Sequence, residues 1–242
     1  MLSKLLSESS RTIVFTGAGM STESGLPDFR SADRGMWNNR NPAELASTEA
    51  MARNQDEFVR FYRWRIASMR SCRPNKGHRI LADWEKRGKV HGIITQNVDD
   101  YHEQAGTRRI AKLHGDLGSL RCMGCGKRYE AALYLPPEAL TNCACGGFVR
   151  PNVVLFGERL PEEALACAEQ WAAGCDLLVV LGSSLAVSPA NQIPLLAKRR
   201  GAKLAIVNHD PTPLDGYADL VLHASIGEAL SGAAKAFEEE EA

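Results

Sequence analysis

The chain has 242 residues, of which 44% are hydrophobic and 24% are charged, which is enough to form one medium domain or a large domain with a small inserted one. Lysine plus arginine equals aspartate plus glutamate at 29 each, so the net charge provides no attraction to nucleic acid or to an acidic membrane. The first six residues lack the apolar core of a signal peptide, and no run approaches ~18 uninterrupted apolar residues. We therefore expect a cytoplasmic protein that binds neither membranes nor a specific nucleic acid.

Five short aliphatic runs are typical of buried parallel strands: residues 12–15, 90–95, 177–181, 203–207 and 220–222. Helical patterns lie between and after them, at residues 75–87, 162–173, 190–199 and 225–238. Strands that alternate with helices in this way predict an α/β fold with a Rossmann-like parallel sheet.

Two stretches interrupt this alternation. Residues 31–75 are polar, helical and rich in arginine and aromatic side chains, and residues 117–150 contain a cluster of cysteines. We expect a helical module and a zinc-ribbon module that pack together as a smaller inserted lobe. The Rossmann-like domain then comprises residues 1–30, 76–116 and 151–242. A seam between two lobes is a usual place for a cofactor and a substrate to meet.

A glycine turn follows the first predicted strand. Gly17, Ala18 and Gly19 have the spacing with which backbone N–H groups approach a phosphate, but the third glycine stands at position 25, and Thr22 occupies its usual place. An ordinary glycine turn is the alternative interpretation. The acidic residue that binds a ribose in hydride-transferring Rossmann enzymes is also missing, because the chain runs into the arginine-rich insertion.

Small polar residues follow two later strands. Gly182, Ser183 and Ser184 come after residues 177–181, and Asn208 comes after residues 203–207. Since the carboxyl ends of parallel strands line the ligand crevice of an open α/β sheet, these residues are candidate ribose and phosphate contacts. Taken singly, each also fits an ordinary loop.

Four cysteines stand close together in the second insertion: Cys122, Cys125, Cys143 and Cys145. Four thiolates are the usual ligands of a closed, tetrahedral structural zinc site, which has no open position for a catalytic water. A nucleic-acid-binding zinc ribbon is disfavoured because the segment has few aromatic residues and only modest positive charge. We interpret the other cysteines as packing residues: Cys72, Cys167 and Cys175.

Amide, carboxylate and imidazole side chains lie in the middle of the chain. Gln96, Asn97 and Asp99 directly follow an aliphatic run, which places them at the expected crevice. His114 lies on a later turn, where it can titrate and reach a substrate. A lone histidine is more often structural, so His114 stands out only because of its neighbours.

These segments resemble the sirtuin family in order and spacing, from about residue 11 to residue 226. The matching segments are residues 17–25, 27–30, 95–99, 113–115, 156–158 and 181–185, with the four cysteines between them. The resemblance implies a large lobe that binds NAD and a small lobe with one structural zinc ion. The implied dinucleotide contacts are Gly17, Ala18, Gly19, Thr22, Asp28, Phe29, Arg30, Gln96, Asn97, Asp99, Gly182, Ser183, Ser184, Asn208 and Ile226.

The resemblance also implies NAD-dependent protein-lysine deacetylation. In the family mechanism, the acyl oxygen of the substrate lysine attacks the ribose carbon as nicotinamide leaves, and an alkylamidate forms. Asn97 and Asp99 would hold the nicotinamide carboxamide, and Phe29 would shield the intermediate from water. His114 would be the general base on a ribose hydroxyl, a role that suits an imidazole with a pKa near ~6.5. The expected products are nicotinamide, O-acetyl-ADP-ribose and free lysine.

The expected partner is an acylated lysine on a protein or peptide. Its backbone would lie between residues 154–158 and 185–189 by β-augmentation, with contacts from Val154, Phe156, Gly157, Glu158 and Val187. Tyr62 and Arg65 resemble a pair that recognises acidic acyl groups such as succinyl in one sirtuin subgroup, since both lie on one helical face. That subgroup usually has alanine in place of Thr22, so deacetylation is preferred and desuccinylation is the alternative.

Two other activities remain as alternatives. The same pocket could catalyse NAD glycohydrolysis or ADP-ribosyl transfer, or the chain could be a non-catalytic NAD-binding module. The non-catalytic module is disfavoured because His114, Asn97 and Asp99 are all present. The sequence departs from the family pattern at Asp100, where glycine is usual, and in the Cys-x-Cys spacing of the second cysteine pair.

Overall fold

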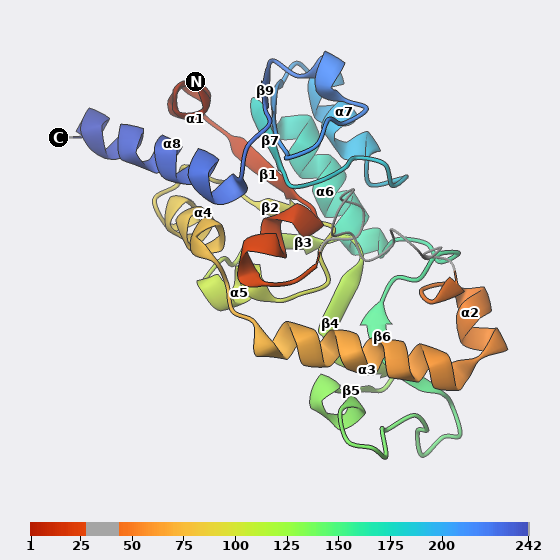
Figure 1. Cartoon of the computed structure of the whole chain (residues 1–242). Coiled ribbons are helices and arrows are strands. Elements are labelled where there is room, and N and C mark those ends of the chain that lie inside the picture. Colours follow the sequence, from red (N-terminus) through yellow and green to blue (C-terminus); the bar gives the residue numbers. More distant parts are fainter. Residues whose placement is uncertain (28–43, 242) are drawn as a thin grey trace.

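A computed structural model describes residues 1–27 and 44–241 (Figure 1). The larger sheet is parallel throughout, in the order β3-β2-β1-β7-β8-β9. Its strands are β1 Thr12–Thr16, β2 Ile93–Thr95, β3 Ile110–Lys112, β7 Leu177–Leu181, β8 Lys203–Val207 and β9 Leu220–Leu222. The order reverses between β1 and β7, and such a switch point is where open α/β sheets bind ligands. The predicted α/β class is confirmed.

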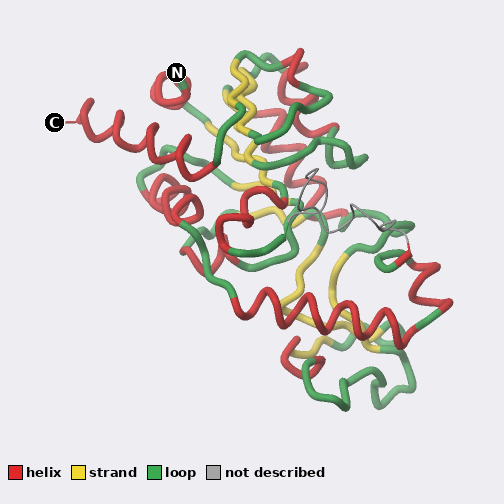
Figure 2. The backbone as a smooth tube through the Cα atoms, in the orientation of Figure 1, coloured by secondary structure: helices red, strands yellow, loops and turns green. Residues whose placement is uncertain are grey.

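Helices cover both faces of this sheet (Figures 1 and 2). On one face, the core formed with the strands includes side chains of three helices: α1 Leu2–Glu8, α4 Lys76–Lys86 and α8 Ile226–Glu241. The core on the other face includes α6 Glu162–Gly174 and α7 Gln192–Arg199. Because apolar side chains cover both faces, β1 and β7 are buried along their whole length, as continuous aliphatic runs predict.

A second, antiparallel sheet has the order β5-β4-β6. Its strands are β4 Gly115–Cys122, β5 Arg128–Glu130 and β6 Val149–Val153. Helix α3 Gln55–Ser71 packs on it through a separate core that includes Phe58, Tyr62 and Leu120, and α2 Thr48–Arg53 precedes α3. Figure 2 shows this helix running beside the small sheet. Short elements complete the described chain: α5 Tyr101–Ala105, η1 Ala18–Ser24, η3 Ala131–Tyr134 and η4 Asp215–Tyr217.

The predicted elements match the structure within a few residues at their ends. The strands at 177–181, 203–207 and 220–222 have the predicted bounds, whereas the run at 90–95 is a strand only from Ile93. Strand β3 was not predicted, because its sequence, Ile-Ala-Lys, is not an aliphatic run. Both β4 and β6 extend across the boundaries expected for the zinc module, at 117 and 150, and the division into modules stays a prediction.

None of the helices in residues 1–27 and 44–241 is both long and apolar enough to cross a membrane.

Candidate functional site

The glycine turn after β1 packs directly against the turn after β7. Gly17 N donates to Leu181 O at 3.1 Å, and Gly19 N donates to Gly182 O at 2.9 Å. A Cβ on Gly17 would lie 2.6 Å from Gly182 O, and one on Gly182, where φ is +62°, would lie 2.5 Å from Met20 N. Only glycine allows this approach of the two backbones. The turn therefore brings the ends of β1 and β7 together at the switch point of the sheet.

The third glycine of the motif has a different function from the first two. Gly25 ends the 3₁₀ helix η1 in the left-handed conformation, with φ of +95°, and its N–H donates to the carbonyls of Ser21 and Thr22. A residue that terminates a helix is commonly glycine for this reason. Its position at 25 instead of 22 thus follows from the length of η1, and Thr22 turns its hydroxyl back to Gly19 O at 2.9 Å.

Polar residues from several strand ends meet beside this turn. Gln96, after β2, donates from Nε2 to the hydroxyl of Ser183, after β7, at 2.7 Å. Ser183 is buried and Ser184 is half-buried, while Asn208, after β8, donates its side-chain amide to Asp210 O at 2.7 Å. The carboxyl ends of three parallel strands thus supply the expected polar groups along one edge of the sheet.

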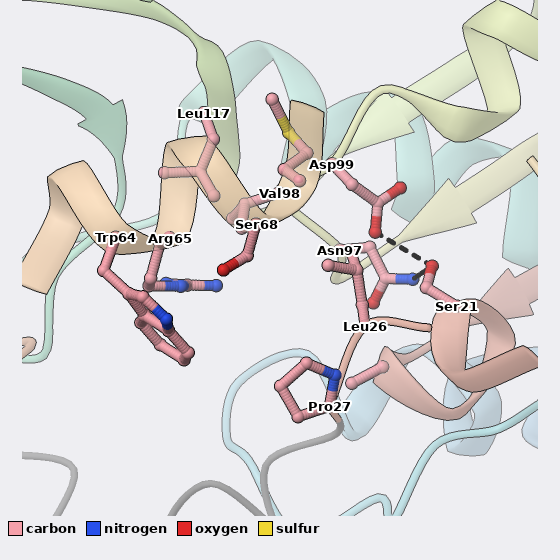
Figure 3. Close-up of a pocket in the computed structure, with 12 residues that line it drawn as sticks. Ser21, Leu26, Pro27, Trp64, Arg65, Ser68, Asn97, Val98, Asp99 and Leu117 are labelled. Atoms are coloured by element: carbon pink, nitrogen blue, oxygen red, sulfur yellow. Dashed lines mark hydrogen bonds between the residues drawn. The ribbon is translucent and has the colours of Figure 1, made fainter. Parts of the chain in front are cut away.

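A buried polar cluster joins the glycine turn to the segment after β2 (Figure 3). The hydroxyl of Ser21 donates to Asp99 Oδ2 at 2.9 Å, and Asn97 Nδ2 donates to Ser21 Oγ at 3.3 Å. Tyr101 N also donates to Asp99 Oδ1 at 3.2 Å. Burial raises the pKa of the Asp99 carboxyl, and the bonds from Ser21 and Tyr101 oppose this rise. The sequence indicates Ser21 only as part of the segment 17–25, and its contact with Asp99 depends on the fold.

This cluster forms one wall of a pocket whose other wall is α3. Figure 3 shows Trp64, Arg65 and Ser68 of α3 on the side of the pocket opposite Ser21 and Asn97. The described lining is Ala18, Ser21, Leu26, Pro27, Trp64, Arg65, Ser68, Met69, Asn97, Val98, Asp99 and Leu117. The pocket therefore lies between the carboxyl ends of strands of the large sheet and helix α3, which packs on the small sheet.

His114 follows β3 and is held in one tautomer. Its Nδ1 lies 2.9 Å from the carbonyl oxygen of Gln96. A carbonyl only accepts hydrogen bonds, so Nδ1 carries the proton and Nε2 carries the lone pair of the neutral ring. The next residue, Gly115, has φ of +71°, and a Cβ there would collide with Asn152 O. The chain therefore turns sharply after His114 and enters β4.

The segment after β6 lies next to His114. Val154 N donates to His114 O at 2.9 Å. Phe156 N donates to Ala46 O at 2.9 Å and its carbonyl accepts from Thr48 N at 3.1 Å, while its side chain is exposed. Gly157 follows with φ of +93°. The second expected edge, residues 185–189, has no regular strand; Val187 O accepts from Asn191 N at 2.9 Å.

The four cysteines of the small sheet form one cluster. Their sulfur atoms lie within 4.8 Å of one another, with 3.5 Å between Cys122 and Cys145 and 3.7 Å between Cys125 and Cys143. Zinc bonded to four sulfurs at about 2.3 Å would separate them by roughly 3.8 Å. The Cys145 N–H and the Tyr129 hydroxyl, 3.0 Å away, lower the pKa of Cys143 to about 6. The donor set therefore fits a structural zinc ion, and Cys-x-Cys spacing is compatible with it.

Tyr62 and Arg65 are close to each other but differ in their exposure to the pocket. The guanidinium carbon of Arg65 lies 5.7 Å from the centre of the Tyr62 ring. Arg65 lines the pocket, whereas Tyr62 is 1% exposed in the core under the small sheet. Burial raises the pKa of the Tyr62 hydroxyl, which therefore stays neutral, and burial lowers the pKa of Arg65 against the opposing effect of Tyr62 and Asp99. Only the guanidinium of this pair lines the pocket.

The predicted contacts Asp28, Phe29 and Arg30 lie outside the described residues. Ile226 is buried at the start of α8.

Comparison with known proteins identifies the family. The Sir2 family model matches residues 17–189. NAD-dependent protein deacetylase 1 of Geobacillus kaustophilus is 54% identical over 227 residues, which cover 93% of both chains. A Sir2 homolog solved as an NAD complex superposes with a TM-score of 0.93 at 38% identity, covering 100% of this chain and 94% of the other. A Sir2 structure with a deacetylated p53 peptide and 3'-O-acetyl ADP ribose has a TM-score of 0.89 at 36% identity, covering 95% and 94%. The chain therefore belongs to the Sir2 family, the sirtuins that its motifs resemble.

Proposed function

We propose that this chain is an NAD-dependent protein-lysine deacetylase, which converts acetyl-lysine and NAD into free lysine, nicotinamide and O-acetyl-ADP-ribose. One observation carries the proposal: the ends of β1 and β2 bring Ser21, Asn97 and Asp99 into one buried cluster, with His114 fixed by Gln96 at the neighbouring strand end. The Geobacillus relative, named a deacetylase, is similar along nearly the whole chain.

The reaction divides between two groups of residues. NAD supplies the nicotinamide that leaves and the ribose that receives the acetyl group. Asn97 and Asp99 hold the carboxamide of nicotinamide, since Asp99 offers acceptor lone pairs beyond those that Ser21 and Tyr101 use. His114 accepts the proton of a ribose hydroxyl at Nε2, because its Nδ1 already donates to a backbone carbonyl.

The remaining contacts of the dinucleotide are assigned to the edge of the sheet. The backbone of the glycine turn faces the phosphates, and polar side chains after β2, β7 and β8 bind the riboses. The proposed contacts of the dinucleotide within the described residues are, together with Asn97 and Asp99, Gly17, Ala18, Gly19, Thr22, Gln96, Gly182, Ser183, Ser184, Asn208 and Ile226. Asp28, Phe29 and Arg30 are proposed contacts from outside the described residues.

The acetylated peptide is proposed to bind along the segment after β6. Val154 and Gly157 supply backbone groups, Phe156 supplies its exposed side chain, and Val187 borders the opposite side. Addition of an extended peptide to such an edge uses main-chain hydrogen bonds, which accept many sequences.

The four cysteines hold one zinc ion that stabilises the small sheet. None of the seven cysteines, all within the described residues, forms a disulfide, which suits a reducing compartment, and we assign the protein to the cytoplasm.

The test is an incubation of the purified protein with NAD and peptides that carry acetyl-, succinyl- or longer acyl-lysine. We expect deacetylated peptide, nicotinamide and O-acetyl-ADP-ribose in equal amounts, measured by mass spectrometry. Nicotinamide release at the same rate without acylated peptide would instead identify a glycohydrolase or an ADP-ribosyltransferase. Failure to consume NAD with any peptide would contradict the proposal.

A second candidate, desuccinylation, is favoured by the guanidinium of Arg65 in the pocket. A succinyl chain ends in a carboxylate, which a guanidinium binds with charge-assisted hydrogen bonds. We expect Arg65→Met to leave acetyl-lysine turnover within about threefold and to lower any succinyl-lysine turnover by at least about tenfold. A comparable loss of both activities would show that Arg65 supports the structure of α3 instead of acyl selection.

A further inference from the structure

Three charged side chains meet beneath the segment that follows β6. Glu158 Oε1 accepts from Arg121 Nη2 of β4 at 3.1 Å and also from Arg150 Nη2 of β6. We call these three residues the Glu158 clamp. Its two arginines belong to the small sheet, and its carboxylate belongs to the segment proposed to bind the peptide. The clamp therefore ties that segment to the small sheet.

Arg150 is the most deeply buried residue of the Glu158 clamp. Its side chain is 0% exposed, and a buried charge is costly unless it is paired and its donors are satisfied. Its Nη1 donates to Val153 O at 2.9 Å, and its Nε donates to the sulfur of Met123 at 3.0 Å. Met123 stands between the two zinc ligands of the first cysteine pair. A side chain held in this way has little freedom to follow a moving Glu158.

The second carboxylate oxygen of Glu158 closes the turn on itself. Leu155 N donates to Glu158 Oε2 at 2.8 Å, and Glu158 N donates to Leu155 O at 2.9 Å. Gly157, in the left-handed conformation between them, permits the tight turn. Both oxygens of Glu158 are thus engaged within the protein, and the backbone of residues 155–158 is fixed by its side chain.

The fixed turn lies directly beside two other parts of the site. Val154 N donates to His114 O, so one end of the segment is joined to the histidine. The N–H of Phe156 is bonded to Ala46, before α2, and its carbonyl is bonded to Thr48, the first residue of α2. A shift of residues 155–158 would therefore displace the backbone groups that face an incoming peptide.

We propose that Glu158 is a positioning residue for the acylated peptide: its carboxylate does not bind substrate but holds residues 154–158 in place through Arg121 and Arg150. This inference rests on the proposed function for its kinetic readout. Its structural readout, the protection of the Leu155 amide, is independent of any activity. The clamp fixes one wall of the peptide site and leaves the dinucleotide site unaffected.

The kinetic test compares Glu158→Gln and Arg121→Met with Arg128→Met as the matched control. Arg128 lies opposite Arg121 on β5 and is exposed, so it carries the same charge on the same sheet. For Glu158→Gln we expect a peptide KM about tenfold higher, with the KM of NAD within about twofold and kcat within about threefold. Arg121→Met should raise the peptide KM about threefold, and Arg128→Met should leave it unchanged.

The structural test is hydrogen exchange on the same proteins. The Leu155 amide should exchange at least about tenfold faster in Glu158→Gln, because it loses a charged acceptor. The Leu117 amide, which donates to Val98 O at 2.7 Å, should keep its rate. If Glu158→Gln does not fold, Arg121→Met still tests the clamp, since that side chain is 38% exposed.

Three results would overturn the proposal. One is an unchanged peptide KM together with an unchanged Leu155 exchange rate. Another is a loss of kcat at constant KM, which would place Glu158 in the chemical step. The third is a uniform rise of exchange across β4, β5 and β6, which would make the clamp a general support of the sheet. Wild-type protein that does not turn over acetyl-lysine would contradict the proposed function alone, and the Leu155 measurement would still decide the clamp.

Discussion

A backbone carbonyl contributes to the orientation of His114. Gln96 O fixes the proton on Nδ1, and Gln96 itself follows β2, the strand next to β3. The parallel pairing of β2 with β3 places the carbonyl and the ring at the same edge. A ring with a fixed tautomer presents the same nitrogen to every substrate, which is what a general base requires.

We therefore expect His114→Ala to keep the fold and the binding of NAD while kcat falls by a factor of about 10²–10⁴, the usual contribution of general base catalysis. NAD affinity is measured by calorimetry and turnover by peptide mass spectrometry. His91→Ala, a change at a histidine before β2 and outside the pocket, is the control and should retain turnover. Near-normal activity of His114→Ala would mean that another group accepts the proton.

The ionised carboxylate of Asp99 lowers the stability of the folded state. Because burial raises the pKa of its carboxyl, the folded state binds a proton more readily than the unfolded state, so ionisation of Asp99 at neutral pH destabilises the fold. We expect Asp99→Asn to raise the melting temperature at pH 8 by about 2–4 °C, equivalent to ~1 kcal/mol in a domain of this size, while deacetylation is lost. The gain should narrow as the pH falls towards the raised pKa of Asp99. A lower melting temperature at pH 8 would show that the bonds to Ser21 and Tyr101 outweigh the cost of burial.

At the scale of elements, the small sheet depends on its cysteine cluster. Gly147 lies so close to the first cysteine pair that a Cβ there would be 2.7 Å from Cys122 Sγ, so the two turns that carry the ligands pack back to back. Strand β5 has only three residues, and a sheet of so few strands needs packing on a helix or another stabilising contact. A metal bonded across the two turns would stabilise β4, β5 and β6 together.

We expect the protein to bind one zinc ion per chain, measured by atomic absorption, and a chelator to remove it with a loss of amide protection in β4 and β5. Because the large sheet has its own cores, β7 and β8 should stay protected. Cys143→Ser should reproduce the effect, and Cys167→Ser should retain zinc. Equal loss of protection in both sheets would contradict this division.

At the scale of the whole molecule, two buried histidines connect helices α4 and α5 to the large sheet. The rings of His78 and His102 are 4.8 Å apart, and His102 Nε2 lies 3.1 Å from the hydroxyl of Thr16. Burial, together with Arg79, lowers the pKa of His78 to about 4, and burial, His78 and Lys112 lower the pKa of His102 well below its usual value. Both rings are neutral in the folded state.

This predicts the direction of acid denaturation. The unfolded state gains protons on these histidines below about pH 6.5. In the folded state, His78 gains its proton only near pH 4, and the pKa of His102 lies well below its usual value. The free energy of unfolding should therefore fall by about 1.4 kcal/mol per pH unit for each histidine in this interval. Urea unfolding at pH 7 and pH 5 measures it. His102→Gln keeps a donor for Thr16 without a titrating group, so its slope should be about half as steep; an unchanged slope would assign the effect to other groups.

The sequence by itself determined the class of the fold, the family and a candidate set of four zinc ligands. Aliphatic runs such as residues 177–181 become strands because burial on both faces needs apolar side chains throughout. Cys122 and Cys125 are close in the chain, so local spacing already shows a ligand pair. The order of the motifs led to the Sir2 family, which the comparisons confirm.

Only the tertiary structure decided which side chains meet. Ser21 and Asp99 are 78 positions apart, and their contact follows from the pairing of β1 with β2. Tyr62 and Arg65 lie on one helix, yet only Arg65 lines the pocket, because the rest of that face packs on the small sheet. The direction of the Glu158 carboxylate is set by β4 and β6. Local patterns give the backbone conformation and the chemistry of each residue, whereas the partner of a side chain depends on how distant strands and helices pack.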